Sequence, residues 1–159
     1  MNEKAGGKHP VKVLFLCTGN SCRSQMAEGW ARHLKGGTVD ARSAGIEARG
    51  LDPRAVRVME EAGVDIGGQR SKTLADLPRR EFDLVITLCG HAAENCPVFP
   101  GRTKVIHRGF DDPPRLAEGA KSEEEALAHY RRVRDEIRAF GVTLPDASDK
   151  DEGREGAKR

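Results

Sequence analysis

The 159-residue sequence has little of what membrane, secreted and nucleic-acid-binding proteins need. Its longest apolar run near the N-terminus, residues 13–17, has five residues, whereas a bilayer-spanning helix needs about 20. The first ten residues, MNEKAGGKHP, contain no apolar stretch of the kind found in signal peptides. The 27 Lys and Arg against 25 Asp and Glu leave a formal charge of only +2, too small to attract DNA or anionic lipid. We therefore expect a cytoplasmic protein that binds neither nucleic acid nor membrane.

Internal repeats and linkers are also missing, and the length fits a single domain. The polar residues 1–9 are expected to form a flexible N-terminus. The last fifteen residues carry no large apolar side chain, so we expect a disordered tail over residues 143–159. The folded domain is accordingly predicted over residues 10–142.

Only four cysteines occur in the chain, and they are Cys17, Cys22, Cys89 and Cys96. In a reducing compartment, thiols are catalytic, redox or metal-binding groups rather than a disulfide framework. No Cys-x2-Cys spacing is present, which ranks a zinc site below the other interpretations.

Hydrophobic patterns alternate between strands and helices along the chain. They predict strands at residues 11–17, 39–44, 84–89 and 103–107, and helices at residues 24–34, 52–62, 90–95 and 122–140. Asp52 with Pro53 marks a helix start and Gly63 its stop, and Ser122 with Glu125 is typical of a capping box. The alternation predicts an α/β fold with a parallel sheet covered by helices on both faces. Ligands bind such sheets at the carboxyl ends of the strands, where Cys17 is placed.

The segment after the first predicted strand, residues 17–24, has the pattern Cys-x5-Arg. The pattern alone is weak evidence, because it occurs again from Cys96 to Arg102. The second copy contains Pro97 and Pro100, which have no amide hydrogen to donate, and it opens no helix. Only the first copy lies between a buried strand and a helix, as an anion-binding loop requires.

Residues 17–24 have the composition of an oxyanion cradle. The central Gly-Asn pair tolerates unusual dihedral angles, and no proline interrupts the amides. Arg23 can hold two oxygens of a tetrahedral anion, and the positive field of the loop favours Cys17 as a thiolate nucleophile that Ser24 can hydrogen-bond. A buried cysteine beside an ordinary loop is the alternative. The oxyanion-binding candidates are Thr18, Gly19, Asn20, Ser21, Cys22, Arg23 and Ser24.

The cradle is part of a longer resemblance, carried by the stretches CTGNSCRSQMAEGWA, SAGIEARGLDP, TLCGHAAENCP and HRGFDDP. At these residues the sequence resembles the low-molecular-weight tyrosine phosphatase family, and more closely the thioredoxin-coupled arsenate reductases built on that fold. The resemblance implies a flavodoxin-like four-stranded parallel sheet. It also implies arsenate as substrate, phosphate and sulfate as competing oxyanions, thioredoxin as electron donor and no tightly bound cofactor. We expect a monomer.

The loop after the last predicted strand reads HRGFDDPP (residues 107–114). A carboxylic acid there can protonate a leaving oxygen, but an aspartate before proline is also a common turn or cap residue. The resemblance places the general acid at Asp112, with Asp111 as the second candidate. It breaks down at Pro114, where phosphatases of this fold carry Tyr, and at Arg108, where similar reductases often carry Trp.

Cys89 and Cys96 are seven residues apart. If the intervening segment is helical, their Cα atoms are about 10.5 Å apart, and a disulfide needs roughly 4.4–6.8 Å. The pair can therefore close only if the helix unwinds. The resemblance implies a relay in which Cys17 attacks arsenate, Cys89 attacks the Cys17–arsenic adduct and Cys96 then attacks Cys89. Core cysteines remain an alternative, and Cys22 is expected to be structural or a side-reaction thiol.

Three polar residues match positions that bind potassium in some similar reductases, and they are Asn20, Glu28 and Ser43. Ordinary structural roles are the alternative. A further Asp of those proteins corresponds to Lys72, whose ammonium group would occupy or repel a cation site. We expect no strong potassium dependence.

The sequence is compatible with three functions: an arsenate reductase serving arsenic detoxification, a phosphatase forming a cysteinyl-phosphate from aryl phosphates, and a non-enzymatic thiol sensor or metal-binding module. Cys89 and Cys96 favour the first over the second, because a phosphatase needs neither thiol. Arg23 and Asp112 favour an enzyme over a sensor. We expect an arsenate-reducing enzyme with weak phosphatase activity, since arsenate and phosphate share geometry and charge.

Overall fold

The computed structural model describes residues 9–78 and 81–146 of the chain. In this part, four strands form one parallel sheet in the order β2-β1-β3-β4. The strands are β1 (Val11–Cys17), β2 (Val39–Gly45), β3 (Leu84–Thr87) and β4 (Lys104–His107). The predicted α/β fold with a four-stranded parallel sheet is therefore confirmed. The chain runs from β1 to one neighbour and then crosses to the other, which makes the carboxyl end of β1 the switch point.

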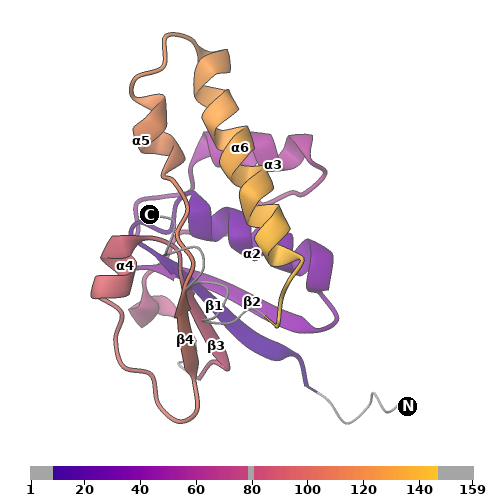
Figure 1. Ribbon diagram of the computed structural model, residues 1–159, viewed down its shortest axis with the longest axis vertical. Helices are drawn as coiled ribbons and strands as arrows, with labels where there is room; N and C mark the ends of the chain where they lie inside the picture. Colours follow the sequence, from indigo (N-terminus) through magenta and orange to yellow (C-terminus); the bar gives the residue numbers. More distant parts are fainter. Residues whose placement is uncertain (1–8, 79–80, 147–159) are drawn as a thin grey trace.

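Helices cover both faces of the sheet, but unequally (Figure 1). They are α2 (Arg23–Lys35), α3 (Pro53–Glu61), α4 (Gly90–Glu94), α5 (Pro113–Ala117), α6 (Glu123–Gly141) and the 3-10 helix η1 (Leu74–Asp76). Helices α2, α3 and α6 pack on one another and enclose the larger hydrophobic core. The other face is covered by a smaller cluster that includes Leu77 after η1 and Ala92 of α4.

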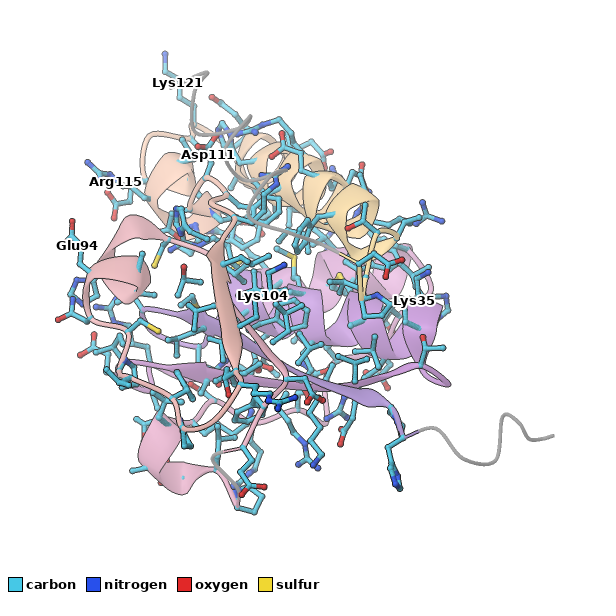
Figure 2. The ribbon with its side chains drawn as sticks, turned by 60° about the horizontal axis from the view of Figure 1, so that its bottom comes forward. Lys35, Glu94, Lys104, Asp111, Arg115 and Lys121 are labelled. Atoms are coloured by element: carbon cyan, nitrogen blue, oxygen red, sulfur yellow. The ribbon has the colours of Figure 1, made fainter. Side chains whose placement is uncertain are left out.

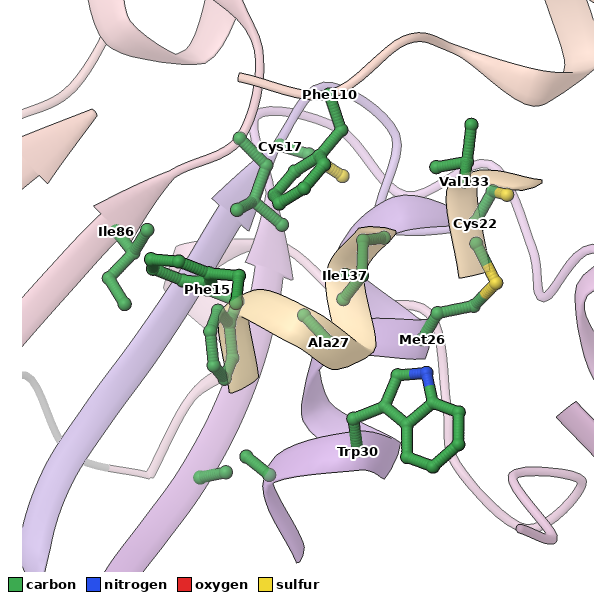
Figure 3. Close-up of a cluster of buried hydrophobic side chains, with 14 of the residues drawn as sticks. Phe15, Cys17, Cys22, Met26, Ala27, Trp30, Ile86, Phe110, Val133 and Ile137 are labelled. Carbon is green, nitrogen blue, oxygen red and sulfur yellow. The ribbon is translucent and has the colours of Figure 1, made fainter. Parts of the chain in front are cut away.

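Strand β1 is apolar on both faces because each face supplies a different core. Phe15 and Cys17 point into the larger core, and Leu14 and Leu16 point into the smaller cluster. All four side chains are buried. Figure 3 shows Cys17 at the edge of the larger core, near Phe110. The central strand thus delivers Cys17 from a rigid core to the switch point.

The predicted start and stop of α3 are confirmed. The Asp52 carboxylate accepts a hydrogen bond from the Arg54 amide at 2.9 Å, Pro53 opens the helix and Gly63 has φ 87°. The capping box predicted for α6 is only half present. The Ser122 hydroxyl accepts from the Glu125 amide at 3.0 Å.

The prediction of the second hydrogen bond of that capping box is wrong. The Glu125 carboxylate accepts from the Lys121 amide, one residue before the cap, instead of from the Ser122 amide. The sequence pattern does not distinguish these two amides, because both lie within reach of a carboxylate at the third helical position.

Several boundaries differ from the sequence-based expectations. The strand predicted to end at Cys89 ends at Thr87, so Cys89 becomes the N-cap of α4. Helix α5 was not predicted. Leu144 is buried in the core, so the packed structure extends past residue 142. The remainder of the two predicted soft ends, residues 1–8 and 147–159, lies outside the described residues.

None of the helices within residues 9–78 and 81–146 combines the length and apolar character that crossing a bilayer requires.

Candidate active site

The loop that joins β1 to α2, residues 18–22, lies at the switch point of the sheet. Asn20 has φ 48°, the left-handed conformation expected for a tight loop. Gly19 does not share it, so its role differs from the one predicted. A Cβ atom on Gly19 would lie 2.7 Å from Cδ of Arg49. The absence of a side chain at Gly19 thus lets the Arg49 side chain lie against the loop.

The backbone of the loop is held from outside. Every carbonyl of residues 17–22 accepts a hydrogen bond, in order from Ile46 N, Glu47 N, Arg49 N, Gln25 Nε2, Asp52 N and Met26 N. By contrast, no amide of residues 18–23 donates to any residue that the structure describes. Paired carbonyls beside unpaired amides are the arrangement that an oxyanion site needs, because amide hydrogens stabilise a negative charge.

Two contacts fix the segment that holds these carbonyls. A Cβ on Gly45 would lie 2.8 Å from both the Thr18 carbonyl oxygen and the Asn20 nitrogen, so only glycine lets the end of β2 approach the loop. At the other end of the segment, the Tyr130 hydroxyl of α6 donates to the Asp52 carboxylate at 2.6 Å. The loop is therefore organised by β2 and α6, which are distant in sequence.

Cys17 is buried, and its Sγ lies 2.9 Å from Oγ of Ser24, as predicted. Asn20 Nδ2 donates to the same Ser24 oxygen at 2.8 Å. Because an amide nitrogen can only donate, the Ser24 oxygen accepts from Asn20, and its own hydrogen is left to donate to sulfur. The Ser24 hydroxyl is thus the donor to the Cys17 sulfur.

A cavity of about 210 Å³ opens over the loop. It is lined by Cys17, Thr18, Gly19, Ser21, Cys22, Arg23, Arg49, Asp112 and Pro114. The predicted residues Asn20 and Ser24 are fully buried, and their side chains support the loop from below. The cavity combines two thiols, two guanidinium groups and a carboxyl group.

Arg23 is positioned by the chain that leads to α5. Its Nη1 donates to the Phe110 carbonyl at 3.0 Å, and its Nη2 lies 3.6 Å from the Asp112 carboxylate. Asp112 occupies the N-cap position of α5, yet its side chain makes no capping hydrogen bond. The capping role that competes with an acid role is therefore absent, and the carboxyl group faces the cavity instead.

Asp111, the second candidate acid, is engaged elsewhere. Its carboxylate forms an ion pair with Arg132 of α6 at 3.0 Å, and 63% of its side chain is exposed. Figure 2 shows Asp111 on the chain between β4 and α5, beside α6. Asp112 is the better placed of the two carboxyl groups.

Arg108, where the family resemblance also breaks down, packs on two aromatic rings. The Arg108 guanidinium stacks on the Phe110 ring with its Cζ 4.6 Å from the ring centroid, and on Phe140 at 5.6 Å. Pro114, the other position at which the resemblance breaks down, lines the first cavity directly and places no aromatic ring there.

Cys89 lies against the loop. Its Sγ is 3.2 Å from the Thr18 hydroxyl and accepts a hydrogen bond from the Ala92 amide at 3.4 Å. It also lines a second cavity, of about 240 Å³, together with Arg23 and His107. The structure thus brings a second thiol to the edge of the Cys17 loop.

Cys96 is half-buried beside the smaller hydrophobic cluster, and burial raises the pKa of its thiol. Helix α4 separates it from Cys89, as the predicted helical spacing requires. All four cysteines are free thiols.

Cys22 is buried at the N-cap of α2, within the larger core shown in Figure 3. Burial raises the pKa of Cys22 well above its ordinary value, and the nearby Asp52 carboxylate raises it further. The thiol is therefore protonated at neutral pH, which supports a structural role.

The expected cation-site residues form one hydrogen-bonded chain. Asn20 Nδ2 donates to Ser43 Oγ at 3.0 Å, and Ser43 Oγ donates to Glu28 Oε1 at 2.5 Å. Two cations of the protein already face the buried Glu28 carboxylate: Arg32 at 2.5 Å and the Lys72 ammonium at 3.9 Å. Burial lowers the pKa of Lys72. Among the described residues, no cluster of His, Cys, Asp and Glu is suited to a metal ion.

Sequence reasoning missed Arg49, which lines the anion cavity, and the Asp52–Tyr130 contact that anchors the loop. Gly45 and Gly19, which permit the close approaches, carry the only local signal of this arrangement. An isolated glycine does not tell which segment approaches it, so the partners could not be found from the sequence.

Comparison with known proteins points to one family. The family described as low molecular weight phosphotyrosine protein phosphatase matches residues 12–144. The arsenate reductase of Bacillus licheniformis is 56% identical over 125 residues, and that of Halalkalibacterium halodurans is 54% identical over 125 residues. Both alignments cover 79% of this chain and 88% of the relative.

Solved structures give the same result. An arsenate reductase in the oxidized state superposes with a TM-score of 0.69 at 34% identity, covering 84% of this chain and 95% of the other. An Erwinia amylovora tyrosine phosphatase, at 24% identity, shares the fold with a TM-score of 0.65 over 85% of this chain and 91% of its own. By sequence over most of its length and by its four-stranded sheet, the chain belongs to the low molecular weight phosphotyrosine protein phosphatase family.

Proposed function

We propose that this protein reduces arsenate to arsenite. The observation that carries the proposal is the second thiol at the anion loop, where Cys89 Sγ lies 3.2 Å from the Thr18 hydroxyl. Hydrolysis of a phosphate ester needs one nucleophilic thiol, whereas reduction of arsenic needs two thiols to supply two electrons. The identity of more than 50% to arsenate reductases over 79% of the chain supports the same assignment.

In the first step, Cys17 attacks the arsenic atom of an arsenate held by the loop amides and Arg23. A sulfur–arsenic bond forms while an arsenic–oxygen bond breaks. Asp112 lies beside Arg23 on the same cavity and donates the proton with which the oxygen leaves as water. The amides and Arg23 stabilise the charge that develops on the remaining oxygens.

In the second step, the Cys89 thiolate attacks Cys17 Sγ. A sulfur–sulfur bond forms, the sulfur–arsenic bond breaks and its electron pair stays on arsenic, which leaves as arsenite. The Ala92 amide and the Thr18 hydroxyl both contact Cys89 Sγ and can stabilise its negative charge.

In the third step, Cys96 attacks Cys89 and releases the Cys17 thiolate. The resulting Cys89–Cys96 disulfide requires α4 to unwind, because this helix holds the two residues apart. We propose that the dithiol of thioredoxin then reduces the exposed disulfide, in a cytoplasmic setting that keeps the resting thiols reduced. No tightly bound cofactor enters this cycle, and a monomer contains all three relay thiols.

Arsenate-dependent NADPH oxidation in the presence of thioredoxin and thioredoxin reductase tests the proposal. The wild-type protein should turn over arsenate, and Cys17→Ser should abolish the reaction. Cys89→Ser should lose reduction because it lacks the second thiol. Sustained arsenate turnover by Cys89→Ser would exclude the relay.

A phosphatase is the second candidate, favoured by the placement of Asp112 next to Arg23. Hydrolysis of para-nitrophenyl phosphate by the same variants separates the two candidates. We expect slow hydrolysis that Cys17→Ser abolishes and Cys89→Ser retains. Fast aryl phosphate hydrolysis without arsenate reduction would instead support the phosphatase.

A further inference from the structure

Arg49 is a second guanidinium at the anion cavity, and neither the loop pattern nor the relay accounts for it. It follows the end of β2 by four residues and lines the cavity together with Cys17, Arg23 and Asp112. Its amide donates to the Gly19 carbonyl at 2.9 Å, which fixes its backbone to the loop. Its side chain then passes so close to Gly19 that a Cβ atom there would collide with it.

The Arg49 guanidinium lies at the cavity, and its ion pair involves only two of its three nitrogen atoms. It pairs with Glu47 through Nε and Nη2, and both of these contacts go to the same carboxylate oxygen. Nη1 takes no part in that ion pair. About 60% of the Arg49 side chain is exposed, so the group can shift toward an anion without unfolding any packed element.

The chemistry of the substrate explains what such a group would bind. An oxyanion with three oxygens held by the amides and Arg23 would present its fourth oxygen to the rest of the cavity lining, which includes Asp112 and Arg49. In inorganic arsenate, this fourth oxygen is a free hydroxyl or charged oxygen that can accept a hydrogen bond. In an aryl ester, the same oxygen carries an apolar ring, for which a guanidinium is a poor neighbour.

Resting on the proposed function, we propose that Arg49 is a specificity-determining residue that binds the outward oxygen of a free inorganic oxyanion and so favours arsenate over aryl esters. Glu47 acts against it, because the carboxylate competes with the anion for the same guanidinium. Removing Arg49 and removing the charge of Glu47 should therefore change anion affinity in opposite directions.

The test uses two measurements on the full chain. The first is protection of Cys17 from iodoacetamide by inorganic arsenate, located by peptide mapping, which gives a Kd without any turnover. The second is the pair of KM values for arsenate and for para-nitrophenyl phosphate. The variants are Arg49→Met, Arg49→Lys and Glu47→Gln, and the matched control is Arg57→Met on the exposed side of α3.

We expect Arg49→Met to raise the Kd and KM for arsenate about tenfold, as loss of a hydrogen bond to a charged group predicts. The KM for para-nitrophenyl phosphate should change less than twofold. The Kd of Arg49→Lys for arsenate should lie between those of the wild type and Arg49→Met, because lysine keeps the charge but lacks the planar set of donors of a guanidinium. Glu47→Gln should lower the Kd for arsenate about twofold. The alkylation rate of Cys17 without anion should match the wild type, which checks that the loop is intact.

Two results would overturn the inference. One is an Arg49→Met variant whose arsenate Kd equals that of Arg57→Met. The other is an equal rise in KM for arsenate and for the aryl ester, which indicates a general field rather than specificity. If arsenate protects Cys17 but the wild-type protein shows no reductant-dependent turnover, the proposed reductase function fails, and the Kd values alone decide the role of Arg49.

Discussion

The chain contains two segments with the pattern Cys-x5-Arg, and they differ in their backbone pairing and in the element that follows each of them. In residues 17–23 every carbonyl up to Cys22 is paired with the surrounding protein, and the 13-residue helix α2 follows. In residues 96–102 the chain turns between α4 and β4, with Gly101 at φ 71° and Val98 98% exposed. Among the described residues, the Cys96 thiol has a hydrogen bond only to the neighbouring Pro97 carbonyl, at 3.5 Å.

The difference between the two segments lies in their backbones. A cysteine and an arginine bind a tetrahedral anion only when the amides between them are unpaired and converge. At residues 18–23 the amides are unpaired among the described residues, and other residues take up the carbonyls of residues 17–22. At the second segment, two prolines remove amide hydrogens, and no helix begins there.

The largest expected effect comes from exchanging the two arginines for alanine in turn. Arg23→Ala should lower kcat/KM for arsenate by about 10³-fold, because it removes the group that binds two oxygens of the anion as charge develops. Arg102→Ala, in the second segment, should stay within twofold of the wild type. Coupled NADPH oxidation measures both, and similar losses in the two variants would contradict the distinction between the segments.

The cysteines of the two segments should fail at different points of the cycle. Cys96→Ser retains Cys17 and Cys89, so we expect one arsenite per enzyme molecule and then arrest as a Cys17–Cys89 disulfide. Rapid-quench arsenite measurement and mass spectrometry of the trapped protein check this burst. Steady turnover of Cys96→Ser at the wild-type rate would show that the second segment plays no part.

Cys22, inside the first segment, should affect stability rather than activity. Its folded-state pKa is raised by burial, so the folded protein keeps a proton that the unfolded chain loses near pH 9. The free energy of unfolding should therefore fall as pH rises above about 9, by about 1.4 kcal/mol per pH unit for this group. Urea unfolding at pH 8, 9 and 10 should show a shallower decline for Cys22→Ala, and an unchanged slope would contradict the assignment.

The smallest expected effect is that of potassium ions on the hydrogen-bonded chain of Asn20, Ser43 and Glu28. Because Arg32 and Lys72 already face the Glu28 carboxylate, exchanging NaCl for KCl should shift Tm by less than about 1 °C. Thermal unfolding at equal ionic strength measures this shift. A clear rise in Tm or arsenate affinity specific to potassium would mean that an external cation displaces the Lys72 ammonium.

The sequence predicted the sheet because a strand buried on both faces is apolar at every position, as Val13 to Cys17 are. It predicted the loop because the residues that form it are contiguous. The prediction of Asp112 as the general acid depended on the family resemblance, because an aspartate before proline fits a helix cap equally well. The structure places it at the N-cap position but without the capping bond.

What the sequence could not predict consists mostly of backbone contacts between distant segments. The bonds from Ile46, Glu47 and Asp52 to the loop carbonyls involve main-chain atoms, which every residue has. No side-chain pattern reports such pairing. The same holds for helix α5, which is too short for a periodic signal, and for Leu144, whose burial depends on how α6 ends.

The pairing of the loop carbonyls with the segment after β2 also limits how the site can be transplanted. Grafting the eight residues from Cys17 to Ser24 onto another parallel sheet would leave their carbonyls without donors, and these would compete with the anion for the amides. A working graft would also need the segment from Gly45 to Asp52, with glycine at its first position. It would further need a hydroxyl group that donates to the Asp52 carboxylate, as the Tyr130 hydroxyl does. The portable unit of this chemistry is thus the loop together with the segment, from Gly45 to Asp52, that pairs with its carbonyls.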